Sequence, residues 1–143
     1  MFTTRCDFGQ SWDGSNCTGA RSTLSWNNGV YAAITTGYTS SSTGKSNTAS
    51  LAALVGGPAP YIAAQNCENL NVNGNTDWYL PATNELQVLY SNRTVIRNFD
   101  VSGVRYWSST ENSANMAMMV YMHTGSTSIT SKDLSYYVRC VRR

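Results

Sequence analysis

The sequence predicts a disulfide-stabilised α+β domain, and three observations support this prediction. The 143 residues, with a mass of 15.6 kDa, are enough for one domain with its own core. Two helical patterns lie in the middle of the chain and most strand patterns are grouped near its end, an arrangement typical of α+β rather than alternating α/β proteins. The four cysteines are an even number in a small polar chain, as in exported disulfide-linked proteins.

Most polar side chains of this sequence are uncharged. Charged residues make up 13%, whereas serine, threonine and asparagine number 18, 16 and 14. Apolar residues at 41% and aromatic residues at 11% exclude a disordered chain. A net charge of +2 without a run of lysine and arginine argues against a nucleic-acid partner. The longest apolar stretch, 49–64, is broken by glycines and prolines, so we expect no membrane insertion.

The first 26 residues are predicted to form a small β element. Asp13 and Gly14 are a turn signal, and residues 23–26 alternate as a half-buried strand does. Residues 30–34 fit either a short helix or a strand. The polar, low-complexity stretch 35–48 is predicted to be a loop, either a flexible linker or a binding loop.

Two helices are predicted next. The first runs from about 60 to 70, because it starts with a proline and its apolar residues recur at helical spacing. Residues 71–76 follow as a turn. The second helix runs over 83–91. Thr83 can cap the free amides of its first turn, and the charge of Glu85 suits the positive end of the helix dipole.

The remaining elements are predicted strands. Alternating patterns span four segments, 104–109, 116–123, 126–130 and 134–141. Both faces of 116–123 are partly apolar, which is typical of a central strand covered on both sides. The large rings of Trp78 and Trp107 are expected in the core, where they would anchor the sheet to a helix. The guanidinium of Arg139 is expected to bind backbone carbonyls or a carboxylate.

The four cysteines allow three pairings if they form two disulfides. We favour Cys6–Cys17, which would close a short loop rich in turn residues, and Cys67–Cys140, which would tie the middle of the chain to its last strand. Closing the second, longer loop would stabilise the domain by about 4 kcal/mol. Four buried free thiols are the alternative. No Cys-x-x-Cys pair occurs and the only histidine, His123, is distant in sequence, so no metal site of the zinc type is expected.

Three separated motifs resemble one known family. They are residues 77–86 (DWYLPATNEL), 106–111 (YWSSTE) and 137–142 (YVRCVR), and the segment from Cys6 to Cys17 fits the same pattern. In these motifs the chain is similar to the C-terminal domain of the Legionella collagen-like protein, a module at the ends of bacterial surface proteins. Tyr79 and Ala82 depart from the commoner arginine and threonine of that pattern.

This resemblance implies a fold similar to that of C-type lectins, with two helices packed on a twisted antiparallel sheet and long loops displayed from one end. It implies adhesion rather than catalysis. The sequence also resembles the variable C-terminal segment of a conjugative type IV pilus tip adhesin (PilV type). Residues 1–143 would then form a single extracellular domain, joined to the pilus shaft through a preceding part and recognising lipopolysaccharide on a recipient cell in mating. The first residues, Met1 to Thr3, lack the pattern of a signal peptide.

Ligand-binding residues are expected in loops outside the family motifs. Sugar hydroxyls need hydrogen-bond partners, and the C–H face of a sugar stacks on aromatic rings. The candidates are Tyr38, Asn112, Asn115, Tyr121, His123, Lys132 and Asp133. Their proximity is a hypothesis that rests on the lectin-like layout. Lys132 is expected to pair with a phosphate or an acidic sugar of lipopolysaccharide.

Other functions have to be weighed against glycan binding. An enzyme built on His123 and Ser108 would lack the Gly-x-Ser-x-Gly elbow, and the eight scattered acidic residues present no evident carboxylate pair. No cofactor is expected, because the Glu-Pro-Asn and Trp-Asn-Asp motifs of calcium-dependent lectins are absent. A calcium ion bound by oxygen ligands of Glu111, Asn112 and Asn115 is the alternative. A protein-binding or oligomerising cap on a surface fibre is the main alternative.

Overall fold

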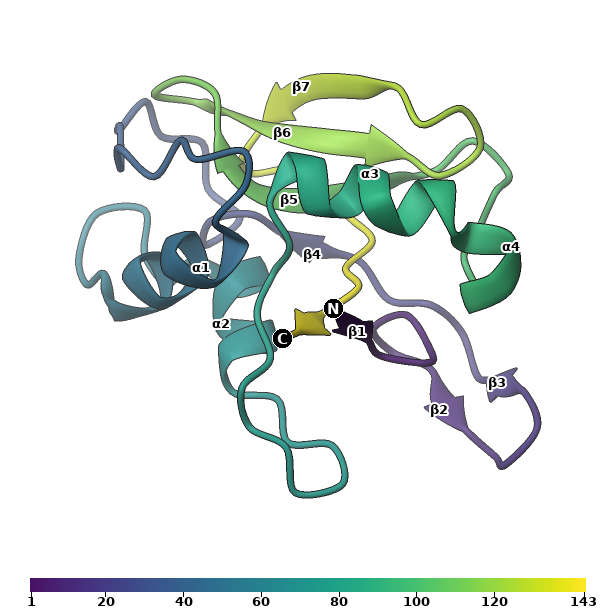
Figure 1. The fold of residues 1–143 in the computed structure, drawn as a ribbon. Helices are drawn as coiled ribbons and strands as arrows, with labels where there is room; N and C mark the ends of the chain where they lie inside the picture. The colour runs from purple at the N-terminus through teal and green to yellow at the C-terminus, as the bar shows by residue number, and fades with distance from the viewer.

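The computed structural model describes all 143 residues and shows a mixed α and β protein with four helices and small antiparallel sheets (Figure 1). The helices are α1 (Gly44–Ala53), α2 (Ile62–Glu68), α3 (Thr83–Ser91) and α4 (Arg93–Ile96). The strands are β1 (Phe2–Thr3), β2 (Ser11–Trp12), β3 (Cys17–Thr18), β4 (Leu24–Ser25), β5 (Arg105–Glu111), β6 (Met116–Tyr121), β7 (Thr127–Ser131), β8 (Ser135–Tyr136) and β9 (Val141–Arg142). No helix has the length and apolar character that a membrane span needs.

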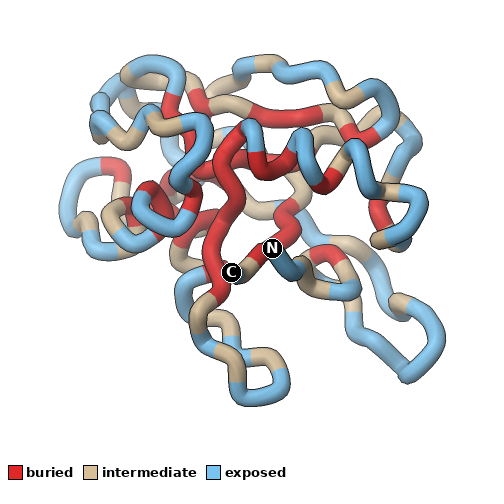
Figure 2. The backbone as a smooth tube through the Cα atoms, in the orientation of Figure 1, coloured by how far each residue is buried: buried red, intermediate tan, exposed pale blue.

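The main sheet has the order β5-β6-β7, and β6 is its central strand. Ala117 and Met119 of β6 face a larger buried cluster that includes residues of α1 and α2, whereas Val120 and Met122 face a smaller one formed with α3. Figure 2 shows the buried path through this strand and through the extended segment that leads into α3. The prediction of a central strand covered on both faces is therefore confirmed.

Aromatic rings fill the larger cluster. Trp26 and Tyr61 meet edge to face with their ring centroids 5.3 Å apart. Trp107 is fully buried and donates its indole N–H to the carbonyl of Leu24 at 2.9 Å. Trp78 is also buried in this cluster. Both motif tryptophans are therefore core residues, as predicted, because such large rings remove much apolar surface from water.

Both predicted disulfides are present and no cysteine is free. Cys6–Cys17 closes a loop over 11 residues and ties β3 to the N-terminal segment. Cys67–Cys140 spans 73 residues and ties α2 to the C-terminal segment next to β9. The N-terminal strand β1 pairs with β9, so the two ends of the chain lie side by side (Figure 1).

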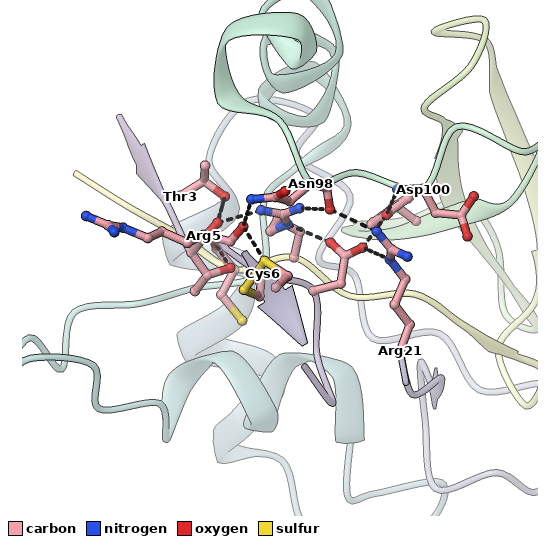
Figure 3. Close-up of polar contacts among 12 residues, drawn as sticks. Thr3, Arg5, Cys6, Arg21, Asn98 and Asp100 are labelled. Atoms are coloured by element: carbon pink, nitrogen blue, oxygen red, sulfur yellow. Dashed lines mark hydrogen bonds and ion pairs between the residues drawn. A yellow bond between two sulfur atoms is a disulfide. The ribbon is translucent and has the colours of Figure 1, made fainter. Parts of the chain in front are cut away.

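In addition to the two disulfides, an ionic cluster around the buried carboxylate of Asp7 links distant parts of the chain. This carboxylate accepts hydrogen bonds from Arg139 Nε, Arg21 Nε and the Tyr106 hydroxyl, each at 2.6 Å. Arg139, which is fully buried, also donates to the carbonyls of Thr4 and Asn98 at 2.6 and 2.7 Å. Figure 3 shows Arg21, Asn98 and Asp100 gathered beside residues 3–6. The expectation for Arg139 is confirmed, since it binds both a carboxylate and backbone carbonyls.

The second predicted helix is α3, with the predicted bounds, but its start is not built as expected. Thr83 is the first helical residue rather than the cap. The carboxylate of Glu85 instead accepts the amides of Ala82 and Gly44 at 3.0 and 3.1 Å. A side chain at Gly44 would collide with this carboxylate and with the Ala82 amide, so this close approach requires glycine. Burial and Glu85 together raise the pKa of the Tyr79 phenol, which donates to Glu85, to about 12.

Other element predictions need correction. Four helices are present instead of two, and the predicted loop 35–48 is wrong from residue 44 onward, where α1 begins. α1 lacks the apolar stripe by which a helix is recognised, because its buried face carries Asn47 and Thr48. Their side chains donate hydrogen bonds to the carbonyls of Ser40 and Leu80. The predicted strand 134–141 is only β8 and the first residue of β9, with the Arg139 cross-link between them.

Residues 30–34 form neither a helix nor a strand. The predicted helix over 60–70 is the shorter α2. The turn over 71–76 is present, closed by a bridge between Val72 and Asn75.

Candidate functional site

The seven candidate residues divide between the two ends of the main sheet. Asn112 and Asn115 lie in the turn between β5 and β6. Lys132, which follows β7, donates its amide to the carbonyl of Asn115, and Glu111 donates its amide to the carbonyl of Tyr38. Tyr38, Asn112, Asn115, Lys132 and Asp133 therefore share one end, called here the loop end. Tyr121 pairs with Arg105 at the opposite end. It lies six positions along the strand from Asn115, a distance of about 20 Å.

A buried ion pair organises the loop end. Lys132 is only 2% exposed, and its ammonium lies 2.5 Å from Glu111 Oε1. The same ammonium donates to the carbonyls of Ile34 and Ala114 at 3.1 and 2.7 Å. It also lies 5.0 Å from the centroid of the Trp26 ring, within range of a cation–π contact. All three donors of the ammonium are thus used inside the domain.

The partner carboxylate holds the irregular loop that precedes α1. Glu111 Oε1 accepts the amide of Thr36 and Oε2 accepts the amide of Gly37, both at 2.8 Å. Burial acts to raise the pKa of Glu111, but the hydrogen bonds from Lys132 and from these two amides outweigh it, and the pKa is lowered. Glu111 therefore remains ionised, and the loop is fixed by bonds from its own backbone to this side chain.

This arrangement changes the role of three predicted residues. Lys132 has no free donor for a phosphate, so we do not retain it as a ligand-binding residue. Tyr38 is half-buried and packs against the larger core cluster. Asp133 accepts a hydrogen bond from the hydroxyl of Ser131. Lys132 and its partner Glu111 act instead as positioning residues for the loop.

A shallow depression of about 450 Å³ begins at the loop end and extends along the main sheet as far as Thr127, between the loop before α1 and the start of α3. It is lined by Thr39, Ser41, Thr83, Asn84, Gln87, Thr110, Glu111, Asn112, Met118 and Thr127. Eight of these residues carry an uncharged hydroxyl or amide. Glu111 is the only charged one, and its carboxylate is already paired. The depression is therefore electrically neutral and rich in hydrogen-bonding groups.

Four lining side chains have hydrogen-bonding groups left for a ligand. Thr39, Gln87, Asn112 and Thr127 are exposed, and their side chains make no hydrogen bond within the domain. Their neighbours are fixed: Asn84 Nδ2 donates to the Ser42 hydroxyl at 3.0 Å, and the amide of Asn84 donates to the carbonyl of Ser41. The depression thus presents two free carboxamides and two free hydroxyls on a rigid frame.

Tyr121 and His123 belong to a separate aromatic group. Their ring centroids are 5.5 Å apart in an edge-to-face arrangement. The Tyr121 hydroxyl accepts from Arg105 Nε at 2.7 Å, and the Tyr136 hydroxyl accepts from Arg105 Nη1 at 2.8 Å. These hydrogen bonds raise the pKa of Arg105. A small pocket of about 290 Å³ adjoins Arg105 and Tyr136.

The acidic and metal-ligating side chains are dispersed. No group of three or more histidine, cysteine, aspartate or glutamate residues is placed to hold a metal ion. Of the residues considered for calcium, Glu111 uses both oxygens within the domain. Asn115 lies 3.4 Å from the Tyr31 hydroxyl, through its Nδ2 atom.

Sequence reasoning identified one residue of the depression, Asn112, and missed its other free groups. Thr39 lies in the stretch that was considered as a binding loop. Gln87 is on the exposed side of the predicted helix, and Thr127 is in a predicted strand. The pattern that links them is only a recurrence of uncharged hydroxyl and amide residues, which is common throughout this chain.

A family model described as the Lcl C-terminal domain matches residues 9–142. The match covers all three sequence motifs. It also covers α3, which borders the depression, and α2, which carries Cys67 of the Cys67–Cys140 disulfide. It also includes every residue that lines the depression. No curated protein matches the chain significantly.

Proposed function

Because the chain belongs to the Lcl C-terminal domain family, we propose that it is a non-enzymatic adhesin domain that recognises a glycan on the surface of another cell. The observation that supports this most directly is the neutral depression at the loop end, with free groups on Thr39, Gln87, Asn112 and Thr127. A sugar hydroxyl both donates and accepts hydrogen bonds, and a carboxamide offers both functions at once. The proposed ligand is a neutral saccharide.

The fixed loop supports binding without a large change of shape. The Lys132–Glu111 pair and its bonds to Ile34, Thr36 and Gly37 hold the residues just before Thr39. A ligand that meets a fixed surface loses less free energy to ordering of the protein. A shallow site with few contacts binds weakly, so several displayed copies would be needed for firm attachment.

The wider assignment is a proposal of the same kind. We propose an extracellular domain with a C-type-lectin-like arrangement at the tip of a conjugative type IV pilus of the PilV type, where it would bind lipopolysaccharide of a recipient bacterium and stabilise the mating pair. Two disulfides without a free cysteine support an oxidising, extracellular location. The three motifs shared with bacterial surface modules support the adhesin role.

The test is binding of the domain to an array of bacterial lipopolysaccharides and neutral glycans, with and without a chelator. Asn112→Ala and Gln87→Ala should each weaken binding to the recognised glycan by roughly 3- to 10-fold, the loss of one net hydrogen bond. Asn69→Ala is the matched control, because Asn69 is exposed and lies at the end of α2, away from the depression. Unchanged binding of both variants would place the site elsewhere, and an array without any binding would contradict the proposal.

One observation favours the alternative of a protein-binding or oligomerising cap. Val30, Tyr31 and Ile34 are all exposed on a single loop, and the Tyr31 hydroxyl lies 3.4 Å from Asn115 Nδ2. Such grouped apolar side chains are typical of protein contacts. A molecular mass that rises with concentration, and that Tyr31→Ser lowers, would favour this alternative over glycan binding.

A further inference from the structure

Arg105, at the start of β5, is a cation without a carboxylate partner. Five of the ten lysine and arginine residues form ion pairs within the domain, and Arg105 is not among them. Asp100, the acidic residue nearest to it in the sequence, accepts hydrogen bonds from the amide and the hydroxyl of Ser102 instead. The positive charge of Arg105 is therefore not neutralised by a side chain of the domain.

Two tyrosines hold the guanidinium of Arg105 in one orientation. Its Nε donates to the Tyr121 hydroxyl at 2.7 Å, and its Nη1 donates to the Tyr136 hydroxyl at 2.8 Å. The guanidinium carbon also lies 5.3 Å from the centroid of each of these rings, within range of a cation–π contact. A cation that is already fixed loses little side-chain entropy when a ligand binds to it.

The donors that remain around this guanidinium have no acceptor in the domain. Nη2 takes part in neither hydrogen bond, so both of its N–H groups are free. The Tyr121 hydroxyl accepts from Arg105, and its own O–H has no acceptor. Free donors beside a fixed positive charge, without a carboxylate among them, favour a ligand that brings a negatively charged oxygen.

The pocket of about 290 Å³ gives a ligand access to Arg105, which is only half-buried. It is lined by Thr23, Gly103, Val104, Arg105, Tyr136 and Tyr137. The Thr23 side chain is exposed, and its hydroxyl makes no hydrogen bond within the domain. The pocket and the depression have no lining residue in common.

The surroundings of Arg105 suit a sugar ring. Tyr136 and Tyr137 stand in the wall of the pocket, and the exposed ring of His123 lies beside Tyr121. The C–H face of a sugar packs on aromatic rings, and its hydroxyls can both donate to and accept from a threonine hydroxyl. The volume is near the lower end of the range for small-molecule sites, about 300 Å³, which suits a single sugar unit.

We propose that Arg105 and this pocket bind one acidic unit of a glycan, whose carboxylate or phosphate lies on the guanidinium. The oxyanion accepts from the N–H groups of Nη2, and the sugar ring lies along Tyr136 toward the Thr23 hydroxyl. Arg105 thus takes the role that the sequence predicted for Lys132, whose ammonium is used inside the domain. The proposal rests on the glycan recognition proposed above but uses no residue of the depression.

The test is a titration of the ¹⁵N-labelled domain, followed by NMR, with methyl β-glucuronide, methyl β-galacturonide, glucose 6-phosphate and the neutral methyl β-glucoside. At least one charged sugar should shift the Nε–H signal of Arg105 and the amide signal of Gly103. The neutral glucoside should bind roughly 10-fold more weakly or less. Comparison of the uronides with the phosphate identifies which oxyanion is bound. The proposal is overturned if no charged sugar moves these signals, or if acetate and inorganic phosphate bind as tightly as the sugars.

Two variants of Arg105 separate its charge from its shape. Arg105→Met removes the cation and should weaken binding of the charged sugar by roughly 10- to 100-fold. Arg105→Lys keeps the charge but not the planar fork, so it should lose only part of the binding. The indole signals of Trp26 and Trp107, which are buried in the core, show whether each variant is folded. Unchanged binding in the folded variants would overturn the proposal.

Two further variants show that the effect belongs to this pocket. Lys45→Met removes one exposed positive charge from α1 and should leave binding of the charged sugar unchanged. A loss as large as that of Arg105→Met would mean that the net charge, and not this pocket, attracts the ligand, and would overturn the proposal. Asn112→Ala should leave the shifts at Arg105 unchanged, so failure of the depression and failure of this pocket are distinguishable.

Discussion

Two buried ionic clusters stabilise this domain, and they differ in what they connect. The Asp7 cluster, formed by Asp7, Arg21, Arg139 and Tyr106, joins side chains from distant parts of the chain. The pair of Lys132 and Glu111 is surrounded mainly by backbone groups of one irregular loop and one turn. The first cluster connects segments that β1–β9 pairing and a disulfide also hold. The second holds a loop without regular structure.

This difference distinguishes the segments that define the fold from the irregular loop that borders the depression. The Asp7 cluster lies beside strands that are already paired, so it adds to contacts that define the fold. A cluster that binds loop amides and carbonyls supplies the hydrogen bonds that secondary structure would otherwise provide. The depression borders the second cluster. Loss of the Asp7 cluster should therefore lower the stability of the whole domain, whereas loss of the Lys132–Glu111 pair should first release the loop.

The largest effect is expected for Arg139→Met. The change leaves the Asp7 carboxylate buried with fewer donors and frees the carbonyls of Thr4 and Asn98. The free energy of unfolding, measured with urea, should fall by about 3–5 kcal/mol. The double variant Asp7→Leu/Arg139→Met should recover part of this loss, because the uncompensated charge causes most of it. A single variant as stable as the parent would show that the cluster contributes nothing.

A smaller loss of about 3 kcal/mol is expected for Lys132→Met, which leaves Glu111 without its cation. Hydrogen exchange of individual amides should show which part of the domain loses stability. The amides of Thr36 and Gly37, which Glu111 accepts, should exchange faster, while the amides within α3 keep their protection. Lys45→Met is the control, because Lys45 is exposed and in no ion pair. Uniform loss of protection throughout the domain would contradict a role confined to the loop.

The contribution of the Lys132–Glu111 pair to the free energy of unfolding should depend on pH. The folded-state pKa of Glu111 is lowered from its ordinary value of 4.5, so its contribution is full above that value and is lost as the pH falls through the folded pKa. Glu111→Gln should therefore reduce stability most at neutral pH, and the difference from the parent should shrink below pH 4.5. Urea denaturation over a pH series measures this. A difference that stays constant with pH would show that Glu111 titrates normally.

The parts of the fold that the sequence predicted are those with local or covalent signals. α3 has a regular apolar stripe, β6 has apolar residues on both faces, and the two disulfides follow from four cysteines and the placement of turn residues. α1 was missed because its buried positions carry Asn47 and Thr48, whose partners lie elsewhere in the chain. Burial of a polar side chain depends on such distant partners, which no local pattern reveals.

The site was predicted only in part for the same reason. The predicted pairing of Lys132 with a phosphate or an acidic sugar requires an exposed ammonium, whereas lysine can be buried when it has a partner. Its partner Glu111 is 21 positions away and was considered only as a calcium ligand. Asn115 directly precedes β6 and Tyr121 is its last residue. The lectin-like layout predicted them together, but the length of β6 places them at opposite ends of the sheet. Distances across a sheet depend on register, which the motifs do not contain.

The smallest effect is expected for an ion pair with the same chemistry in an exposed position. Arg142 Nε donates to Asp77 Oδ1 at 2.7 Å, close to the distances in the Asp7 cluster, but the two side chains remain 26% and 34% exposed. The hydrogen bond from Arg142 lowers the pKa of Asp77. Water and salt screen such a pair, so Asp77→Asn should leave the urea midpoint unchanged. A loss comparable to that of Arg139→Met would show that burial is not the cause of the difference between these pairs.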